Sequence, residues 1–426
     1  MKESCDVLVI GGGPAGSTIS AFLAEQGWQV QLLEKDTHPR FHIGESLLPM
    51  NRELFARLGV AEEIARIGVV KSGAEFHSMV HGKAQTFYFA HQLEPAYRYA
   101  YQVRRAEFDH ILLRNCAAKG ADVREQHRVI EIDFASRNPV VTALDSAGRR
   151  HLWETRFVVD ASGRDTFLAN RFDIKRKNRR HASAALFAHF KGAQRWRGED
   201  EGNISVYWFD HGWIWFIPLK DDIMSVGAVC RPAYLKSRKN EVEPFFLQTL
   251  QSCPLAAERL RGATLASPVT ATGNYSYRAT RMSGERYLMI GDAYAFVDPV
   301  FSSGVWLAMN SACRGAEVVD DFLRGRKPQR RRAFERSVRR GLSAFTWFIY
   351  RVNTPALRHL LLNPNNRFRV VEGLLSLLAG DIFGRTKVAP RLFAFKLIYY
   401  AMNLKMARQS FKAYVQRKQN VASAAR

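Results

Sequence analysis

The chain has 426 residues, of which 47% are hydrophobic and 24% charged, so it is long enough for two or three packed domains and too apolar to be disordered. Basic residues outnumber acidic ones by 63 to 40, but residues 324–426 alone hold 23 basic and three acidic residues. The rest of the chain is close to neutral. This uneven charge argues against a nucleic-acid-binding protein, which would also need a recognisable binding fold.

Neither the cysteines nor the histidines form a metal-binding pattern. The five cysteines are scattered without a C-x-x-C pair, and no histidines have the spacing of metal ligands. No apolar run reaches the length that spans a bilayer, and the first residues do not resemble a signal peptide. We therefore expect a cytoplasmic protein with no disulfide framework and no catalytic metal.

The first elements are expected to alternate as strand, helix and strand. A buried strand over residues 5–10 leads into Gly11-x-Gly13-x-x-Gly16, a helix to about residue 26 follows, and a strand over residues 28–33 ends at Glu34. The glycines permit a tight turn, close approach of a pyrophosphate and close helix–sheet packing, and the acid can accept hydrogen bonds from a ribose. The pattern predicts a dinucleotide site without choosing between NAD and FAD.

The remaining elements predict an α/β protein with a discontinuous first domain. Helices are expected over residues 51–67 and 106–119, strands over 121–133, 157–160 and 287–290, alternating aromatic strands over 180–276, and helices after residue 322. The expected domains are a Rossmann-like FAD-binding domain (residues 1–75, 100–175 and 277–325), a mixed-sheet substrate domain (76–99 and 176–276) and a basic helical C-terminal region (326–426).

Three segments beyond the glycine turn resemble the FAD-binding segments of the flavoprotein monooxygenase superfamily, whose fold is of the p-hydroxybenzoate hydroxylase type. They are residues 160–164 (DASGR), residues 291–293 (GDA) and residues 101–109, which include Gln102 and Arg105. In that superfamily the aspartate of the Gly-Asp pair contacts the ribityl chain, and Asp292 matches it. A helix N-cap is the alternative role for Asp292, and one residue can play both.

Further motifs narrow the resemblance to flavin-dependent halogenases of the phenol and pyrrole type. Residues 213–218 are the W-x-W-x-I-P pattern, residues 296–304 resemble F-x-x-P-x-x-S-x-G, and residues 40–49 are similar to a flavin-proximal loop. Lys71 stands where the family places its reactive lysine. The resemblance implies FAD binding by Gly11, Gly13, Pro14, Ala15, Gly16, Ser17, Glu34, Lys35, Arg40, Ser46, Gln102, Arg105, Val129, Asp160, Gly163, Asp292, Pro299, Gly304 and Val305.

The resemblance also implies a reaction. FAD would arrive as FADH2 from a separate flavin reductase, because no second glycine motif for NADPH is present. With O₂, and with chloride or bromide held near Ser303 and Gly304, it would give hypohalous acid. Lys71 would then position or covalently carry the halogen. Trp213, Trp215 and Pro218 would keep the organic substrate away from the flavin.

Residue patterns without the resemblance favour plainer roles. A lone lysine is most often solvated, and two tryptophans two residues apart in a strand share one face and are more often sheet core.

The residue at position 301 bears on the substrate. Tryptophan halogenases carry a glutamate just before S-x-G, and Phe301 occupies that place. Because phenylalanine cannot stabilise a cationic ring intermediate by charge, we expect an electron-rich substrate such as a phenol or pyrrole, free or bound to an acidic acyl carrier protein, in secondary metabolism. The rivals are an aromatic hydroxylase or a geranylgeranyl-reductase-like enzyme of the same fold, and a non-catalytic flavoprotein or membrane-associated scaffold.

The basic C-terminal region leaves four roles open. Leu392, Phe395, Tyr399, Met402 and Met406 are expected to lie on one helical stripe within the basic stretch 391–418. A packed helix with a solvated basic face ranks first. Docking of an acidic carrier protein and peripheral contact with an anionic membrane come next, and nucleic acid ranks last.

Overall fold

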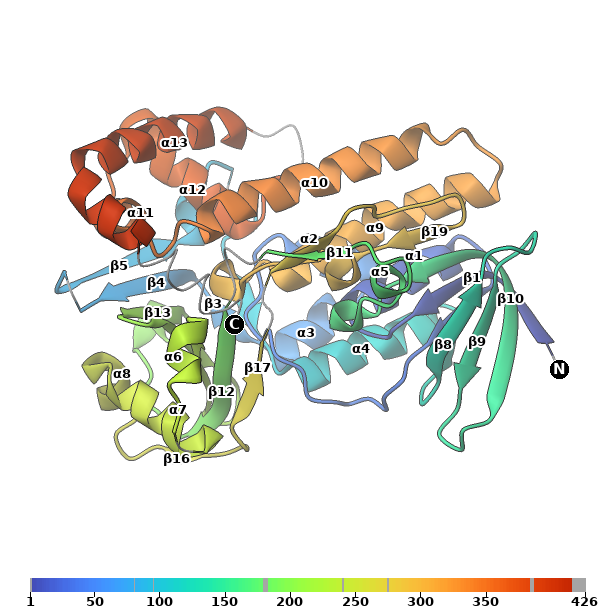
Figure 1. Ribbon diagram of the computed structural model, residues 1–426, viewed down its shortest axis with the longest axis horizontal. Helices are drawn as coiled ribbons and strands as arrows, with labels where there is room; N and C mark the ends of the chain where they lie inside the picture. The colour runs from blue at the N-terminus through green and yellow to red at the C-terminus, as the bar shows by residue number, and fades with distance from the viewer. Residues whose placement is uncertain are drawn as a thin grey trace.

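The computed structural model describes residues 2–79, 81–94, 96–178, 183–239, 241–273, 276–383 and 387–415. Figure 1 shows the sheet that contains β1 and β10 at the right and the strands β12 and β13 of a second sheet at the lower left. Helix α10 runs above both, and α11 to α13 gather at the upper left. The mixed α/β fold expected from the sequence is confirmed.

Seven strands among the described residues form the first sheet, in the order β7-β2-β1-β10-β9-β8, with β19 also paired to β10. The N-terminal part of β10 pairs antiparallel with β9, and its last three residues pair parallel with β19. The strands are β1 (Lys2–Ile10), β2 (Val30–Leu33), β7 (Asp122–Arg124), β8 (Arg128–Asp133), β9 (Val140–Leu144), β10 (Arg150–Asp160) and β19 (Tyr287–Met289).

Helices cover the centre of this sheet. Residues 7–10 of β1 are buried, as expected for a parallel strand enclosed on both faces. Helix α1 (Pro14–Glu25) starts with a proline, whose missing N–H costs nothing in the first turn. It packs against α4 (Arg105–Ala118) and α9 (Gly304–Leu323). The expected unit of strand, helix and strand is confirmed.

The second sheet has eight strands in the described ranges, in the order β16-β12-β15-β14-β13-β4-β5, with β17 beside β12. The strands are β4 (Gly73–Ser78), β5 (Lys83–Tyr88), β12 (Ala184–Lys191), β13 (Ile204–Phe209), β14 (Gly212–Pro218), β15 (Ile223–Cys230), β16 (Thr264–Leu265) and β17 (Thr270–Thr272). Two small sheets join β3 (Val69–Lys71) to β6 (Ala100–Gln102), and β11 (Lys175–Lys177) to β18 (Tyr277–Ala279) and β20 (Ala295–Phe296).

Two expected elements were wrong in extent. The helix expected over residues 51–67 is split into α2 (Asn51–Leu58) and α3 (Ala61–Ile67), because Gly59 adopts a left-handed φ of 78° and ends the first helix. The strand expected over residues 121–133 is divided into β7 and β8, because the chain turns at Gln126, which has a φ of 58°.

The C-terminal region is helical, as expected. The helices outside the core of the first sheet are α5 (Phe167–Arg171), α6 (Pro232–Lys236), α7 (Val242–Gln251), α8 (Pro254–Arg259), α10 (Gln329–Ile349), α11 (Pro355–Leu362), α12 (Val370–Ala379) and α13 (Val388–Lys405). The 3-10 turns include η1 (Phe89–His91), η2 (Gly163–Asp165), η5 (Gly291–Ala293), η6 (Pro299–Phe301) and η7 (Arg367–Arg369). Of the helices described, none combines the length and apolarity that crossing a membrane requires.

The expected stripe on α13 is confirmed where it packs. Leu392, Phe395 and Tyr399 are buried, and Met402 and Met406 pack against the core. The opposite face was expected to be basic and solvated, and it is only partly so because large apolar side chains are exposed on it as well. Residues 416–418 of the expected basic stretch lie outside the described residues.

Candidate functional site

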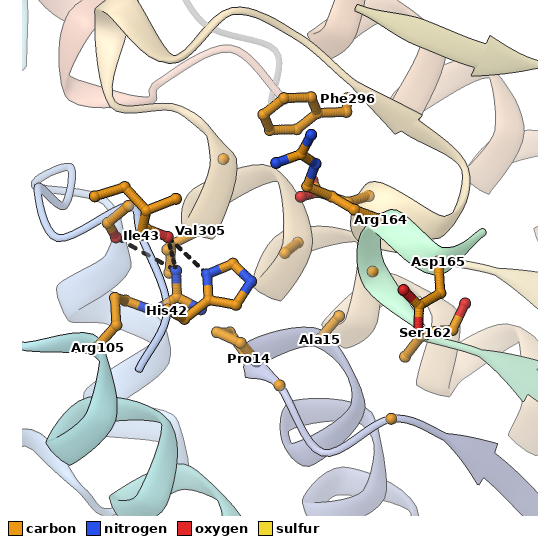
Figure 2. A pocket seen from close by; sticks show the side chains of 18 of the residues that line it. Pro14, Ala15, His42, Ile43, Arg105, Ser162, Arg164, Asp165, Phe296 and Val305 are labelled. Atoms are coloured by element: carbon orange, nitrogen blue, oxygen red, sulfur yellow. Dashed lines mark hydrogen bonds between the residues drawn. The ribbon is translucent and has the colours of Figure 1, made fainter. Parts of the chain in front are cut away.

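A cavity of about 350 Å³ lies between the two large sheets (Figure 2). Its floor is the glycine turn at the start of α1, and its walls come from the end of β2, the loop over residues 40–46, residues 161–165 after β10, and β14 of the second sheet. Asp292 and residues near the start of α9 close it. The cavity therefore sits at the carboxyl ends of the parallel strands, where α/β folds place their ligands.

The glycine turn fits a pyrophosphate. A Cβ built on Gly16 would lie 1.8 Å from the carbonyl oxygen of Gly11, so this glycine is required for helix–strand packing. A Cβ on Gly13 would meet only the Arg40 guanidinium, at 3.8 Å, and would otherwise project into open space. Gly13 lines the cavity at the N-terminus of α1, whose free N–H groups favour an anion. This open space is the kind that a phosphate group bound to the turn would occupy.

Glu34, which was expected to accept hydrogen bonds from a ribose, also holds the backbone of the glycine turn. Its carboxylate accepts the Gly12 N–H at 2.6 Å and the Asp36 N–H at 2.9 Å, and the side chain is buried. It therefore fixes the glycine turn from beneath. Each oxygen has two acceptor positions, so contact with a ribose hydroxyl stays compatible with these bonds.

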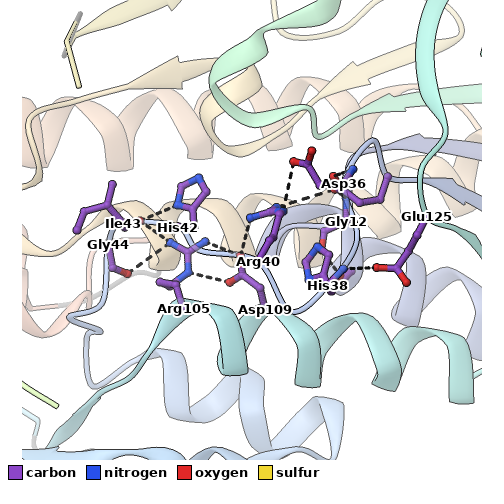
Figure 3. A network of polar contacts seen from close by, with 12 residues as sticks. Gly12, Asp36, His38, Arg40, His42, Ile43, Gly44, Arg105, Asp109 and Glu125 are labelled. Atoms are coloured by element: carbon purple, nitrogen blue, oxygen red, sulfur yellow. Dashed lines mark hydrogen bonds and ion pairs between the residues drawn. The ribbon is translucent and has the colours of Figure 1, made fainter. Parts of the chain in front are cut away.

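Two arginines hold positive charge beside the turn (Figure 3). Arg105 donates to both oxygens of Asp109, at 2.7 and 2.9 Å, and to the Ile43 carbonyl at 2.9 Å. Arg40 lies 3.6 Å from Asp109 and 3.9 Å from Glu34. Burial alone would raise the pKa of Asp109, but the charge and hydrogen bonds of Arg105 hold it below its usual range. The network anchors the loop over residues 40–46 to α4.

His42 belongs to the same loop and was not expected in the site. It lines the cavity, and its Nδ1 lies 2.7 Å from the Ile43 carbonyl (Figure 2). Burial, reinforced by the Arg105 charge, lowers the pKa of His42 to about 4. The ring is therefore neutral at physiological pH, with Nδ1 as the donor to that carbonyl. No sequence spacing pointed to it.

Lys71 is buried behind the wall of the cavity. Its Nζ donates to the Ser46 Oγ at 2.9 Å and to the Leu47 carbonyl at 3.0 Å, and the ring centre of Phe89 is 5.3 Å away. The Ser302 Oγ lies 3.0 Å from the Ser46 Oγ, and both serines line the cavity. Burial lowers the pKa of the Lys71 ammonium to about 7. Lys71 is thus connected to the cavity through two hydroxyl groups.

The tryptophan pair belongs to the wall that β14 of the second sheet contributes to the cavity. Trp213 and Trp215 point to the same face of β14, their ring centres are 5.8 Å apart, and both line the cavity. Trp215 Nε1 donates to the Ser225 Oγ at 3.2 Å.

Asp292 also lines the cavity. Burial raises the pKa of Asp292 to about 6, against the lowering effect of the nearby Arg164 and Arg105 charges.

The residues expected at the start of α9 divide between wall and interior. Gly304 and Val305 line the cavity, whereas Ser303 is fully buried. Phe301 is 4% exposed, and its ring centre is 6.4 Å from that of Phe76, which stacks on Trp208 at 5.4 Å. These rings form an aromatic layer beside Ser302.

Most of the residues expected to bind FAD do line the cavity: Gly11, Gly13, Pro14, Ala15, Glu34, Lys35, Arg40, Ser46, Arg105, Val129, Gly163, Asp292, Pro299, Gly304 and Val305. The others lie behind its wall. Asp160 is buried and accepts the N–H groups of Ser162 and Leu168, and Gln102 donates to the Gly202 carbonyl. Gly16, Ser17, Ser303, Phe301, Pro218 and Lys71 are likewise buried behind the surface of the cavity.

Other lining residues were missed. Arg164 and Phe296 stand together at the cavity, with the guanidinium 5.1 Å from the ring centre (Figure 2). Arg164 belongs to the DASGR segment and could have been included on that basis. Ser302 was missed as well, although it stands inside a motif that the sequence analysis singled out. Within the described ranges, no group of three or more His, Cys, Asp or Glu side chains is placed to hold a metal.

The family model of the FAD binding domain matches residues 4–334. This match agrees with the cavity, whose glycine turn, arginines and acidic Asp292 are chemically suited to FAD. Fold and site therefore define an FAD-binding protein.

Similarity to known proteins gives the family. The chain is 34% identical to the solved structure of the myxobacterial chondrochloren halogenase CndH, with a TM-score of 0.78, and the match covers 95% of this chain and 97% of that one. It is 35% identical to a tryptophan 2-halogenase of Chondromyces crocatus over 76% of this chain and 63% of the relative. It is 29% identical to a 1H-pyrrole-2-carbonyl-[peptidyl-carrier protein] chlorinase of Pseudomonas fluorescens, over 89% of each. The chain belongs to the family of flavin-dependent halogenases. It spans less than two thirds of the length of the first curated relatives that it matches.

Proposed function

We propose that the chain is a flavin-dependent halogenase that transfers chlorine or bromine to an electron-rich aromatic ring. The observation that carries this proposal is the hydrogen-bonded series from Lys71 through Ser46 to Ser302, which joins a buried amine to the FAD-binding cavity. An aromatic hydroxylase of similar fold has no need for such an amine. FAD, supplied in reduced form by a separate reductase, would provide the oxidising chemistry with O₂ and halide.

The protein's own residues would hold FAD and keep it apart from the ring. Gly13 and the start of α1 would hold the pyrophosphate, with Arg40 and Arg105 as nearby cations, and Asp292 would accept from the ribityl chain. Trp213 and Trp215 would cover the cavity on the side of the second sheet. Chloride or bromide would lie near Gly304, where the N–H groups at the start of α9 favour an anion.

Lys71 would carry the halogen. With a pKa of about 7, a large fraction of its amine is neutral at physiological pH and has a free electron pair. The neutral nitrogen would attack the halogen of hypohalous acid, so that an N–X bond forms, the O–X bond breaks, and water leaves with the amine proton. The ring carbon would then take the halogen, lose its proton, and regenerate the amine.

The substrate is proposed to be a phenol or a pyrrole, free or attached to a carrier protein. Phe301 and the adjoining rings supply apolar area but no carboxylate to stabilise a cationic ring. An electron-rich ring stabilises that charge itself. The pyrrole chlorinase, whose name includes a peptidyl carrier protein, supports the carrier-bound form, whereas the tryptophan 2-halogenase makes tryptophan the competing substrate to be tested.

The experiment compares wild type with Lys71→Ala and with Lys119→Ala as a control, since Lys119 pairs with Glu25 and neither residue lines the cavity. Each protein receives FAD, a flavin reductase and bromide with a panel of phenols and pyrroles, and products are measured by mass spectrometry. We expect brominated product from wild type and the control, and none from Lys71→Ala, with FAD content unchanged. Hydroxylated product alone, or normal bromination by Lys71→Ala, would contradict the proposal.

A further inference from the structure

The outer face of α13 exposes large apolar side chains in a regular stripe. Phe393, Leu397, Tyr400 and Leu404 are 64%, 57%, 49% and 79% exposed. They stand at spacings of three and four residues, which places them on one side of the helix, opposite the buried Leu392, Phe395 and Tyr399. Helix α13 is therefore apolar on two sides, and the residues that the structure describes cover only one of them.

Exposed apolar residues continue past the end of α13. The helix ends at Lys405 with a turn at Met406, which has a φ of −100° and a ψ of 28°, and residues 407–415 are again helical. Phe411, in this following segment, is 66% exposed. On α13 itself the stripe from Phe393 to Leu404 runs for about 17 Å at 1.5 Å per residue. We call this stripe, together with the basic residues on its flank, the α13 face.

Basic residues flank the stripe, and no acidic residue interrupts it. Lys405, Arg408 and Lys412 are exposed, and the sequence from residue 382 to residue 426 contains no aspartate or glutamate. Among the described residues these three side chains form no ion pair. The α13 face thus combines exposed apolar area with uncompensated positive charge.

A neighbouring turn also exposes an apolar side chain beside basic residues. Phe368 is 77% exposed between Arg367 and Arg369, of which Arg369 pairs with Glu372, and this turn, η7, contacts α13. Phe368 has a left-handed φ of 59°, an unusual conformation for a bulky residue. Phe368 is therefore a further exposed apolar side chain beside α13.

We propose that the α13 face and η7 dock on an anionic membrane surface, with the apolar stripe in the interface and the basic flank against lipid headgroups. Aromatic and leucine side chains on one helical face, with lysine and arginine beside them, are typical of helices that lie in the membrane interface. Two other occupants fit less well. A second copy of the chain would bring the same basic residues together. An acidic carrier protein would have to bury the lysines, which are depleted in the cores of protein–protein interfaces.

The test is co-sedimentation of the full FAD-loaded chain with phosphatidylcholine vesicles, with and without about 30% phosphatidylglycerol. Leu397→Gln/Leu404→Gln removes apolar area, and Lys405→Gln/Arg408→Gln/Lys412→Gln removes charge. The matched controls are Leu152→Gln and Arg150→Gln, because both residues are exposed on β10, remote in sequence from the α13 face. All substituted residues are on the surface, so the variants are expected to fold and to retain FAD.

We expect wild type and both controls to bind the anionic vesicles, and each α13 variant to bind at least about tenfold more weakly. Binding to vesicles of phosphatidylcholine alone should be weaker, and added salt should reduce binding. Unchanged vesicle binding by both variants would overturn the proposal. The proposal would also be overturned if wild type does not bind vesicles but binds an acidic carrier protein, or forms a dimer in sedimentation analysis. In either case the association would be lost in Leu397→Gln/Leu404→Gln.

Discussion

The Nζ of Lys71 lies 2.9 Å from the Oγ of Ser46, although the two residues come from different elements and the lysine is 1% exposed. The bond places the amine directly behind a residue that lines the cavity. A lysine fully enclosed in this way differs from the solvated lysine that its sequence alone would suggest, and its hydrogen bonds decide how its proton is held.

The first prediction concerns the pH dependence of this amine. Burial lowers the pKa of Lys71 to about 7, so the neutral, nucleophilic form appears as the pH rises through 7. The rate of halogenation in a single turnover should therefore increase between pH 6 and 8, about one pH unit on either side of the midpoint, and level off above pH 8. In Ser46→Ala the amine loses one acceptor that favours its charged form, so the midpoint should move to lower pH.

The same Ser46→Ala variant should lower the plateau rate by about tenfold, because the amine is less well positioned. FAD content serves as the control, since a loss of cofactor would lower the plateau without moving the midpoint. A pH profile identical to that of wild type would contradict the role given to Ser46.

The second prediction separates two glycines of one turn. Gly13→Ala places a methyl group in the open space beside Arg40, so the protein should stay folded while its affinity for FAD falls by about tenfold or more. Gly16→Ala brings a Cβ to 1.8 Å from a backbone oxygen. It should lower the free energy of unfolding by about 4 kcal/mol, as severe core substitutions do. Thermal unfolding without FAD and flavin fluorescence titration measure the two effects. Equal stability losses in both variants would refute the distinction.

The third prediction concerns Asp292. Burial raises its pKa to about 6, so between pH 4 and 6 the folded protein binds a proton that the unfolded chain has released, and this stabilising contribution is lost as the pH rises to 6. Asp292→Asn removes that loss. In the absence of FAD, the variant should gain about 1 to 2 kcal/mol over wild type, with the gain growing from pH 4 to 6 and constant above. Denaturant unfolding at a series of pH values measures it.

FAD binding by the same variant should weaken, because the amide offers a poorer acceptor to the ribityl hydroxyls. Tighter FAD binding by Asp292→Asn would show that the carboxylate has no part in holding the cofactor.

The fourth prediction concerns the substrate. With Phe301 in place of an acid, the protein should halogenate phenols or pyrroles at least about tenfold faster than free tryptophan, the discrimination expected of one missing charged contact. Competition between equal concentrations of these compounds, followed by mass spectrometry, measures the ratio. Faster turnover of free tryptophan would contradict the role given to Phe301 in substrate selection.

Much of the first sheet could be predicted from the sequence, because buried parallel strands are continuous apolar runs and the glycine turn has a fixed spacing. The positions of Gly13 and Glu34 beside one cavity follow from the same pattern, whereas Asp292 was predicted from the resemblance to the flavoprotein monooxygenases. Local periodicity could not reveal that Glu34 accepts the Gly12 N–H, or that Lys71 meets Ser46, because those contacts depend on how separate elements pack. Likewise, the sequence predicted the packed stripe of α13, whereas only the packing of Leu392 and Phe395 identifies Leu397 and Leu404 as uncovered.

Strand β19 joins the last residues of β10, although six strands of the second sheet, β12 to β17, lie between the two strands in the chain. Consequently, a growing polypeptide carries its glycine turn, Lys71 and Trp213 for some time before Asp292 and Gly304 are made. At 5–20 residues per second, the ribosome needs about 15 to 60 s to pass from the turn to α9. Capture of FAD is therefore a late event in biosynthesis. A product that terminates before β19 should bind no flavin and leave the edge of β10 open to wrong pairing, which makes chaperone capacity and flavin supply joint determinants of yield.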